Sequence, residues 1–393
     1  MKLLFVHSHK FKHYKGLFYS EGQLPYELFQ SRYLTNFEKV IICARKEEKY
    51  SLENWSLSSG EHIEHISLPD LSIIKDRNKK VKETNSILKR ELVNSDVLVA
   101  RMPSVHGYLA IKLALRLNKP YVVEVVGDVF DSLWNHGSIY GKVLAPLSYA
   151  KHKRMLRKSK YTIYVTDRYL QDRYPSNKKA LTINASNVEL SPTDKECVER
   201  RLQKIEDTND NRPIKIGLIG SYASKYKGID TGIKLVKKLN EKGVNCQLNV
   251  LGSGSNEWLI SLADKLNIKD KIHFDGILSG QEAVSKWLDD KDIYIQPSLT
   301  EGLPRALIEA MSRGLPAVGS RVGGIPELLS QDYLHNPGSL EELFDIVNLF
   351  IKNKELMKTE SKKNYSKSQE YTTDVLMKRR DDFWKEFIKR EVT

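Results

Sequence analysis

Short runs of Val, Ile and Leu recur along the whole chain and alternate with stretches of helical pattern. Such runs are typical of strands buried on both faces, and parallel strands need the helical crossovers between them. In the first half the expected strands are Lys2–His7, Lys39–Ala44, His62–Leu68, Asp96–Ala100, Tyr121–Val126, Tyr161–Val165 and Lys179–Ile183. The helices expected between them include Asn78–Asn94, Val105–Leu117 and Lys142–Arg157. The alternation predicts an α/β protein whose parallel sheets are covered on both faces.

The same alternation begins again at Ile214, after a polar stretch that ends at Asn209-Asp-Asn-Arg-Pro213. Its 393 residues make the chain long enough for two domains of ordinary size. We predict a first domain at residues 1–190 and a second at residues 213–370. Residues 191–212 are expected as a linker, part of it helical at Lys195–Ile205, and residues 371–393 as a terminal helix.

Apolar runs and cysteines limit the possible classes of protein. No uninterrupted apolar run approaches the ~18 residues that a membrane span needs, and the opening Met-Lys-Leu-Leu-Phe-Val-His fits a first strand better than a signal peptide. Cys43, Cys197 and Cys246 are odd in number and far apart, which indicates neither a disulfide framework nor a zinc site. We therefore expect a cytoplasmic protein.

Positive charge is concentrated in the first half of the chain. Residues 1–186 contain 31 Lys+Arg and 18 Asp+Glu, a net charge of +13, which equals the net charge of the whole chain. The charge is densest after the apolar run Val143–Tyr149, at Lys151, Lys153, Arg154, Arg157 and Lys158. A basic helix with apolar residues can lie on an anionic membrane surface, although a run of charge is also typical of a solvated face. No motif for binding nucleic acid accompanies the charge.

Two carboxylates lie eight positions apart in Glu301-Gly-Leu-Pro-Arg-Ala-Leu-Ile-Glu309. Pro304 suits the first turn of a helix, where its missing N–H costs nothing. Glu301 is then expected in the loop before the helix, and Glu309 one to two turns inside it. Free N–H groups at the start of a helix favour a phosphate, and carboxylates accept hydrogen bonds from sugar hydroxyls. The motif therefore fits a sugar nucleotide, but an isolated pair of this kind also occurs on ordinary surface helices.

Several spaced motifs accompany this pair of carboxylates. Lys227-Gly228 follows the first expected strand of the second half, Gly252-Ser-Gly254 follows the next strand, and Gly323-Gly-Ile-Pro-Glu327 follows the last. Over residues 213–330 this order closely resembles the donor-binding domain of the retaining glycosyltransferases of family 4. The resemblance implies the GT-B fold, in which two Rossmann-like parallel-sheet domains face a central cleft. It also implies that the terminal helix crosses back onto the first domain.

The resemblance assigns the principal site residues. Lys227 matches the lysine that contacts the donor diphosphate, where a cation would offset the charge that develops on the leaving group. Glu309 is expected to bind the ribose hydroxyls, and Glu301 to face the transferred sugar. The backbone N–H groups of Gly302 and Leu303 are expected to reach the sugar or a phosphate.

Further positions depart from the family pattern or leave alternatives open. Many relatives carry an arginine where this chain has Ser221, and Lys225 is the expected substitute for that phosphate-binding cation. Gly252 and Gly254 allow either a close approach of the backbone to the donor or simply a tight turn, and the turn fits Gly254 better.

The N-terminal half resembles, more loosely, the bacterial members of the family that build surface polysaccharides. The resemblance rests on Tyr121–Trp134 and Tyr161–Leu170. Asp128 follows a glycine where many relatives have a His-Asp pair. It is expected to act in catalysis by binding a sugar hydroxyl or the acceptor, or else to cap the following segment. Gly22 is the expected phosphate-facing glycine.

Three histidines near the first strand, His7, His9 and His13, match no metal-ligand spacing. We therefore read them as loop residues, with His9 or His13 in reach of the acceptor. Enzymes of the kind that this chain resembles generally need no bound metal, and no cofactor is expected.

Together these features predict a cytoplasmic, retaining hexosyltransferase at the inner face of the membrane. Its expected partners are a nucleoside diphosphate sugar, UDP-linked in the first instance, and a glycan acceptor carried on a lipid. The resemblance implies transfer with retention of anomeric configuration. The leaving diphosphate would depart from one face of the sugar and help to deprotonate the acceptor on that same face. Glu301 therefore binds and orients the sugar, without forming a covalent intermediate. The alternatives are a nucleotide-sugar epimerase of the same fold and a non-catalytic binder of anionic polymers.

Overall fold

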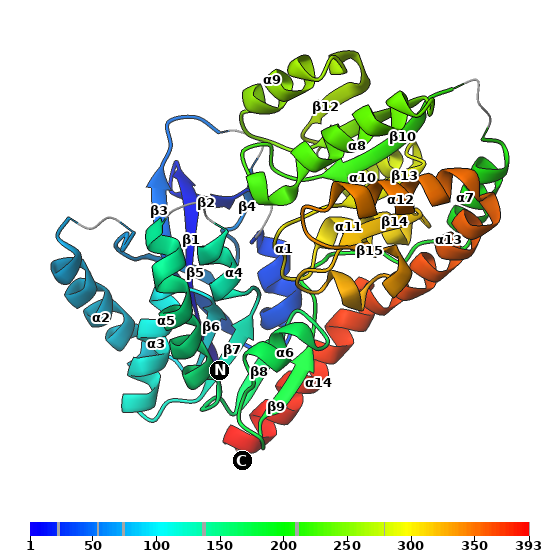
Figure 1. Cartoon of the computed structure of the whole chain (residues 1–393). Helices are drawn as coiled ribbons and strands as arrows, with labels where there is room; N and C mark the ends of the chain where they lie inside the picture. Colours follow the sequence, from blue (N-terminus) through cyan, green and yellow to red (C-terminus); the bar gives the residue numbers. More distant parts are fainter. Residues whose placement is uncertain are drawn as a thin grey trace. The chain divides into compact units, whose positions relative to one another are not determined.

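The computed structural model describes residues 1–21, 24–52, 55–72, 75–135, 139–208, 212–278 and 280–392 (Figure 1). The chain forms two compact units, each with its own sheet and its own buried apolar cluster. Unit 1 comprises Met1–Val129, Leu147–Ala185 and Leu376–Thr393, and unit 2 comprises Phe130–Pro146 and Ser186–Val375.

Unit 1 contains a sheet of nine strands among its described residues, in the order β4-β2-β1-β6-β7-β8-β9, with β3 beside β1 and β5 beside β3. The strands are β1 (Lys2–Tyr14), β2 (Leu17–Ser20), β3 (Lys39–Glu48), β4 (Ser56–Leu57), β5 (Ile63–Ser67), β6 (Val97–Met102), β7 (Tyr121–Val125), β8 (Tyr161–Tyr164) and β9 (Leu181–Asn184). The helices of the N-terminal part of the chain are α1 (Tyr26–Phe29), α2 (Arg77–Val93), α3 (Val105–Arg116), α4 (Val129–Trp134), α5 (Ile139–Leu156) and α6 (Tyr169–Arg173). Of these, α4 after Val129 and α5 up to Pro146 are part of unit 2.

The strand β1 extends further than the sequence indicated. Beyond an irregularity after Val6, it continues to pair with β3, and its end pairs antiparallel with β2. This part contains Lys12 and His13, and such polar residues do not indicate a strand. In the structure Glu47 and Glu48 pair with them on β3. Lys12 lies 3.0 Å from Glu47, so neighbouring opposite charges stabilise a polar pair of strands. The first sheet is therefore mixed, not purely parallel as expected.

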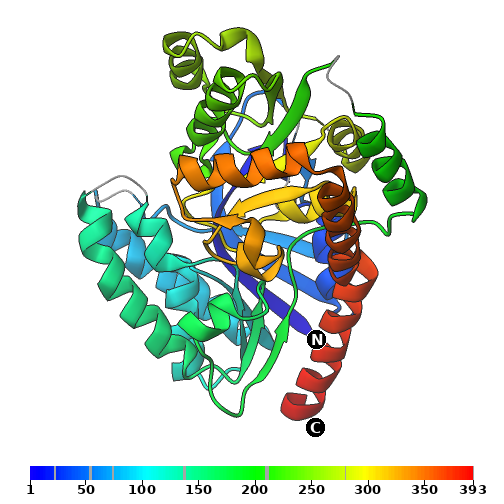
Figure 2. The same cartoon turned by 45° about the vertical axis from the view of Figure 1, so that its right-hand side comes forward.

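The C-terminal helix α14 (Thr373–Val392) packs on the sheet of unit 1 (Figure 2). Its side chains Phe383, Trp384 and Phe387 join the same buried cluster as Leu3 and Phe5 of β1. The helix also contributes a buried cation, Arg380, to the unit. Its guanidinium donates to the Ala185 carbonyl over 2.9 Å and lies 3.9 Å from the Glu124 carboxylate. Apolar burial and a paired buried charge both hold α14 on this sheet.

Unit 2 contains a parallel sheet of six strands among its described residues, in the order β12-β11-β10-β13-β14-β15. The strands are β10 (Ile214–Ile219), β11 (Cys246–Leu251), β12 (Ile272–Gly276), β13 (Ile293–Gln296), β14 (Ala317–Ser320) and β15 (Leu334–His335). The helices are α7 (Glu196–Glu206), α8 (Ile229–Glu241), α9 (Glu257–Lys265), α10 (Gln281–Asp289), α11 (Arg305–Ser312), α12 (Leu340–Lys352) and α13 (Lys354–Ser368). The strand order runs outward in both directions from β10 and β13, as in a doubly wound dinucleotide-binding sheet.

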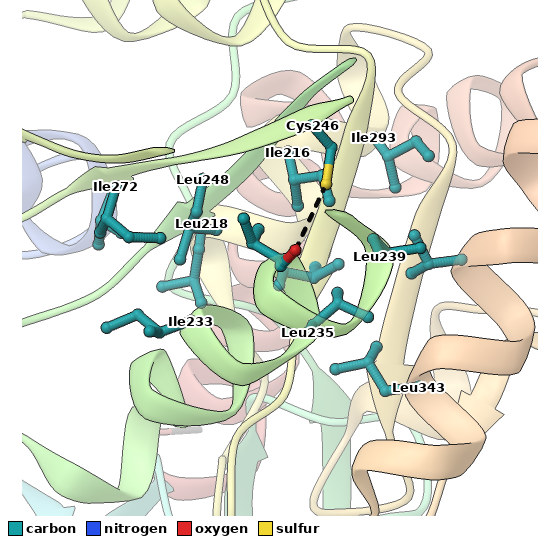
Figure 3. Close-up of a cluster of buried hydrophobic side chains, with 14 of the residues drawn as sticks. Ile216, Leu218, Ile233, Leu235, Leu239, Cys246, Leu248, Ile272, Ile293 and Leu343 are labelled. Carbon is teal, nitrogen blue, oxygen red and sulfur yellow. Dashed lines mark hydrogen bonds between the residues drawn. The ribbon is translucent and has the colours of Figure 1, made fainter. Parts of the chain in front are cut away.

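The core of unit 2 lies between this sheet and the helices α8 and α12 (Figure 3). Ile216 and Leu218 alternate along β10 toward α8, whose Ile233 and Val236 lie one turn apart and face the sheet. Cys246 is buried in this cluster, and its Sγ points to the Val236 carbonyl. The apolar faces of the strands and of α8 therefore form one buried layer. The loops of the unit extend from the elements of this layer.

The division into units differs from the domain boundaries that the sequence predicted. The expected linker at 191–212 contains α7, which is part of unit 2. Arg201 of α7 is buried and donates to the carbonyls of Leu288 and Arg313, over 3.1 Å and 3.3 Å. The helix lies where a helical stretch was expected, at Lys195–Ile205, but it satisfies carbonyls of neighbouring elements and is therefore part of the unit. The boundary lies at Ser186, and residues Phe130–Pro146 also belong to unit 2.

Trp384→Ala should lower the free energy of unfolding by about 3–5 kcal/mol, because it empties a large buried site. The side chain is almost fully buried and lies against Phe37, with ring centroids 5.0 Å apart. Chemical denaturation measures the change. Lys378→Ala, at an exposed position of the same helix, is the matched control and should be nearly neutral. Equal effects of the two substitutions would contradict the role assigned to α14.

Candidate functional site

The candidate site lies at the carboxyl ends of β10 and β13 in unit 2. These two strands are neighbours in the sheet. The connection after β10 leads to β11 on one side of the pair, and the connection after β13 leads to β14 on the other. Ligands of open α/β sheets bind at such a point because two loops diverge there. The loop after β10 leads to Lys227, and the loop after β13 leads to Glu301.

Lys227 and Glu301 form an ion pair across the two loops. The Lys227 Nζ lies 2.7 Å from Glu301 Oε1, although 74 residues separate the two in the sequence. Both side chains are mostly buried, with exposed fractions of 21% and 9%. The structure thus brings together the two residues to which the sequence assigned the diphosphate and the sugar.

Two further donors hold the same carboxylate oxygen. The Ser298 hydroxyl donates to Glu301 Oε1 over 2.7 Å, and the Gln296 amide donates to it over 3.1 Å. The Tyr294 hydroxyl in turn donates to the Gln296 side-chain carbonyl over 2.9 Å. Gln296 and Ser298 are buried, so their amide and hydroxyl fix the Glu301 carboxylate in one position.

These supporting residues were not predicted from the sequence. Tyr294, Gln296 and Ser298 occur at alternate positions along β13 and the loop after it, so their side chains lie on one face. Polar residues at a spacing of two in an otherwise apolar strand were the available signal.

Glycine allows the Lys227 loop to approach the β13 loop. Lys227 ends a short 3-10 turn (Lys225–Lys227), and Gly228 follows it in the left-handed region with φ +69°. A β-carbon at Gly228 would lie 2.1 Å from the Pro297 carbonyl oxygen. A side chain there would therefore push Lys227 away from Glu301.

The other expected donor-binding residues lie around this pair. Ser221 follows β10, and its hydroxyl donates to the Ser253 carbonyl over 3.2 Å. Lys225 is exposed, with its Nζ 5.6 Å from the centre of the Trp258 ring. A β-carbon at Gly252 would lie 2.0 Å from the Gly220 carbonyl oxygen. Glycine at 252 thus serves close packing of the β10 and β11 loops, and Gly254 has the positive φ of a tight turn.

The helix α11 begins just after Glu301. Pro304 is its N-cap, one position earlier than expected, and Arg305 is its first residue. The N–H groups of the first turn precede the first main-chain hydrogen bond of the helix, so they remain donors for a ligand. Leu303 is buried and Gly302 is partly exposed. The Gly302 carbonyl accepts from the Gly324 N–H over 2.6 Å, which ties the loop to the Gly323-Gly324 turn.

Glu309 lies one turn inside α11. Burial raises the pKa of its carboxyl above the ordinary value of 4.5, Arg305 opposes the shift, and Glu189 adds to it. A carboxyl whose ionised form is poorly solvated gains from hydroxyl donors. Its position is therefore suited to bind a diol such as a ribose.

Asp128 of unit 1 is buried and fully engaged with protein groups. It forms an ion pair with Arg173, and the hydroxyls of Tyr169 and Tyr174 donate to it over 3.1 Å and 2.6 Å. These contacts join the end of β7 to α6, which explains the aspartate as a structural residue. Its expected role in catalysis stays a prediction. Gly22 lies outside the described residues.

The histidines of β1 are strand residues, not loop residues as expected. The rings of His7 and His9 are parallel, with centroids 6.3 Å apart, and His13 Nδ1 lies 2.5 Å from the Glu48 carboxylate. Burial lowers the pKa of His9 to about 4, with Arg101 contributing. Within the described ranges, no three His, Cys, Asp or Glu side chains gather as metal ligands would. The expected absence of a metal stays a prediction.

The residues expected to face a membrane lie at the end of α5. Lys151, Arg154, Arg157 and Lys158 are exposed, whereas Lys153 is partly buried and donates to the Tyr149 hydroxyl over 3.0 Å. None of the helices within the described residues is long and apolar enough to cross a bilayer.

Glu309→Gln should stabilise the protein near neutral pH and have little effect in acid. The folded protein holds this proton more tightly than the unfolded chain does, so stability is lost as pH rises through the raised pKa of Glu309. Glutamine removes that loss. Denaturation at about pH 4 and pH 7 should show the gain only at the higher pH.

Glu282→Gln is the control for that experiment. Hydrogen bonding to Lys286 lowers the pKa of Glu282, so its contribution is present at neutral pH and lost on acidification. As pH rises, the stability of Glu309→Gln relative to wild type should therefore increase, whereas that of Glu282→Gln should decrease. A pH-independent effect of Glu309→Gln would contradict the perturbation of Glu309.

A family model and a full-length relative match the chain. The model described as glycosyl transferases group 1 matches residues 200–368. Protein CapJ of Staphylococcus aureus is 35% identical over 374 residues, which cover 93% of this chain and 91% of CapJ. The amylovoran biosynthesis glycosyltransferase AmsK of Erwinia amylovora is 33% identical over 130 residues, 31% of each chain.

The fold also has solved counterparts. The structure of Alr3699/HepE from Anabaena in complex with UDP aligns with a TM-score of 0.66 and 15% identity, over 98% of this chain and 100% of that chain. The resemblance to glycosyltransferases with two Rossmann-like sheets is thereby confirmed, while family 4 and retention of configuration stay predictions. The chain belongs to the glycosyl transferases of group 1 and has the GT-B fold.

Proposed function

We propose that the protein transfers a hexose, or a hexose derivative, from a nucleoside diphosphate sugar to a glycan acceptor with retention of anomeric configuration, as in family 4. The observation that carries this proposal is the Lys227–Glu301 pair beyond β10 and β13, with Glu309 one turn inside the adjoining helix. A cation, an oriented carboxylate and a poorly hydrated carboxylate in one loop region match the three parts of such a donor: diphosphate, sugar and ribose.

The donor is proposed to be UDP-linked. The support is the likeness in fold to HepE, whose structure contains UDP. Lys227 would bind the diphosphate and offset the charge that develops as the nucleotide leaves. In the structure Lys227 is paired with Glu301, so the diphosphate would compete with that carboxylate for the ammonium group. Ser221 and Lys225 complete the proposed phosphate surface, together with the backbone at Gly252, Gly302 and Leu303.

Glu301 is proposed to orient the transferred sugar. Its Oε1 already accepts three hydrogen bonds from protein donors, which hold the carboxylate at a fixed position for sugar hydroxyls. In retention without a glycosyl-enzyme, the leaving diphosphate helps to deprotonate the acceptor on the same face. Glu301 then needs no nucleophilic role. No metal or other cofactor is included in this proposal.

The acceptor is proposed to be a lipid-linked glycan of a surface polysaccharide, at the cytoplasmic face of the membrane. The support is AmsK, which is named for amylovoran biosynthesis, and the excess of positive charge in residues 1–186. An anionic lipid surface attracts such charge.

Glu309→Ala should weaken the binding of UDP by about tenfold or more, because a hydrogen bond to a charged group contributes roughly 1.5–3 kcal/mol. Isothermal calorimetry measures the affinity. Glu282→Gln, which changes an exposed carboxylate on α10 paired with Lys286, is the control and should leave the UDP affinity within about threefold, under 1 kcal/mol. An unchanged affinity in Glu309→Ala would remove the ribose role from this residue.

A further inference from the structure

The sheet of unit 1 reverses its strand order between β1 and β6. The next parallel strand after β1 is β3, on one side of this pair, and the next after β6 is β7, on the other. Ligands of open α/β sheets bind beyond the carboxyl ends of the strands at such a point. Val6 and Ala100 are the last residues that β1 and β6 pair, so His7 and Arg101 come next at this point.

His7, His9 and Arg101 extend one face of this sheet. Phe5 of β1 and Val99 of β6 belong to the apolar cluster of the unit. Side chains two positions apart along a strand point to the same face, so His7 continues the face from Phe5 and Arg101 continues it from Val99. The ring of His9 is parallel to that of His7, with centroids 6.3 Å apart. An apolar face therefore ends in two imidazoles and one guanidinium.

Neighbouring groups hold the backbone between the two imidazoles. The Arg45 Nε of β3 donates to the Ser8 carbonyl over 2.8 Å. His106 Nε2 donates to the Pro69 carbonyl over 2.9 Å, so its Nδ1 accepts from the Ser8 hydroxyl, 2.9 Å away. This short segment of β1 is therefore held in one position before a ligand binds.

The two imidazoles have no hydrogen-bond partner in the part of the chain that the structure describes. Both rings are only partly exposed, and His7 Nδ1 and His9 Nε2 are buried. Buried polar atoms of proteins nearly always have a partner. Two unpartnered imidazoles side by side, at the reversal of the strand order, therefore indicate a place for a polar ligand.

The electrostatic field at these imidazoles is positive. Burial lowers the pKa of His7 well below its ordinary value, with Arg101 and Arg45 contributing. Burial and Arg101 also lower the pKa of His9 to about 4, which Glu21 opposes. Both rings are thus neutral near pH 7 beside the guanidinium of Arg101, which is 8% exposed. Such a field favours a ligand that carries negative charge.

One buried carboxylate also lies near this guanidinium. The register of β6 and β7 places Glu124 beside Arg101. The Tyr33 hydroxyl donates to Glu124 over 2.5 Å, and Arg380 lies 3.9 Å from it. Glu124 is thus engaged by α14 and by the residues before β3, and it is not among the charges that act on His7.

We propose that His7, His9 and Arg101 bind an oxyanion of the acceptor, so that the glycan used by this protein carries a carboxylate or a phosphate. Arg101 supplies the charge, and the imidazole N–H groups donate hydrogen bonds. This inference deepens the proposed function and rests on it, because the acceptor is a substrate only of a transferase. Two sources share this chemistry, the carboxylate of a sugar acid and the diphosphate of a lipid carrier.

The test follows the imidazole signals of His7 and His9 by NMR while the full chain is titrated. His7→Gln and His9→Gln assign the two signals, and every sample contains UDP to occupy the proposed donor site. The probes are methyl glucuronide, inorganic pyrophosphate and, as the uncharged match, methyl glucoside. At least one of the two anions should shift both signals to saturation, and methyl glucoside should leave them unchanged. A response to methyl glucuronide identifies a sugar acid, and a response to pyrophosphate alone identifies a lipid diphosphate.

Arg101→Gln removes the charge and should weaken binding of the responding anion by about tenfold or more. The control is Arg116→Gln, which removes the same charge at an exposed position of α3 and should leave the affinity within about threefold. If Arg101→Gln does not fold, His9→Gln takes its place. Its effect is followed through the signal of His7, and it should also weaken binding.

The inference is overturned if neither anion shifts the signals, or if methyl glucoside shifts them equally. It is also overturned if Arg101→Gln, or His9→Gln in its place, binds the anion as tightly as wild type does. UDP-induced thermal stabilisation separates the two proposals. Stabilisation by UDP without a response to either anion contradicts the oxyanion site alone, whereas a response to an anion without stabilisation by UDP contradicts the donor site alone.

Discussion

The ion pair between Lys227 and Glu301 is the interaction on which the candidate site depends. It joins the loops after β10 and β13, the strands between which the order of the sheet reverses. Each of the two loops has a feature that places its charged side chain. Gly228 lets the Lys227 loop lie against the Pro297 carbonyl, and the buried Gln296 and Ser298 hold the Glu301 carboxylate. Because the carboxylate is held before any ligand arrives, little reorganisation is needed when a sugar binds.

Most of unit 2 was predictable from the sequence, because its structure follows from local patterns. Short Val and Ile runs with helices between them predict a parallel sheet, and the glycines and Pro304 mark where the loops turn. The contacts of Glu301 were not predictable in the same way, since they depend on how far apart β10 and β13 stand. Alternating polar residues in β13 were a signal that went unused, and the structure shows that their face meets Lys227 through Glu301.

Unit 1 shows where sequence patterns fail. The second half of β1 carries lysine and histidine, which read as a loop until the opposite charges of β3 are placed beside them. Asp128 was singled out because many relatives carry a His-Asp pair at this point. This chain has a glycine in place of the histidine. The buried contacts with Arg173 and two tyrosines come from α6 and the residue after it, more than 40 positions later in the chain.

The most direct test of the central claim is a thermal-shift panel with UDP, GDP, ADP and dTDP, with and without magnesium, on the wild-type protein. A ligand present at about a hundred times its dissociation constant stabilises the folded state by roughly 2.7 kcal/mol. We expect UDP to stabilise the protein in this way, and to do so without magnesium. No stabilisation by any of the four nucleotides would contradict a donor site at Lys227 and Glu301, and would favour a binder of anionic polymers that uses the basic first half of the chain.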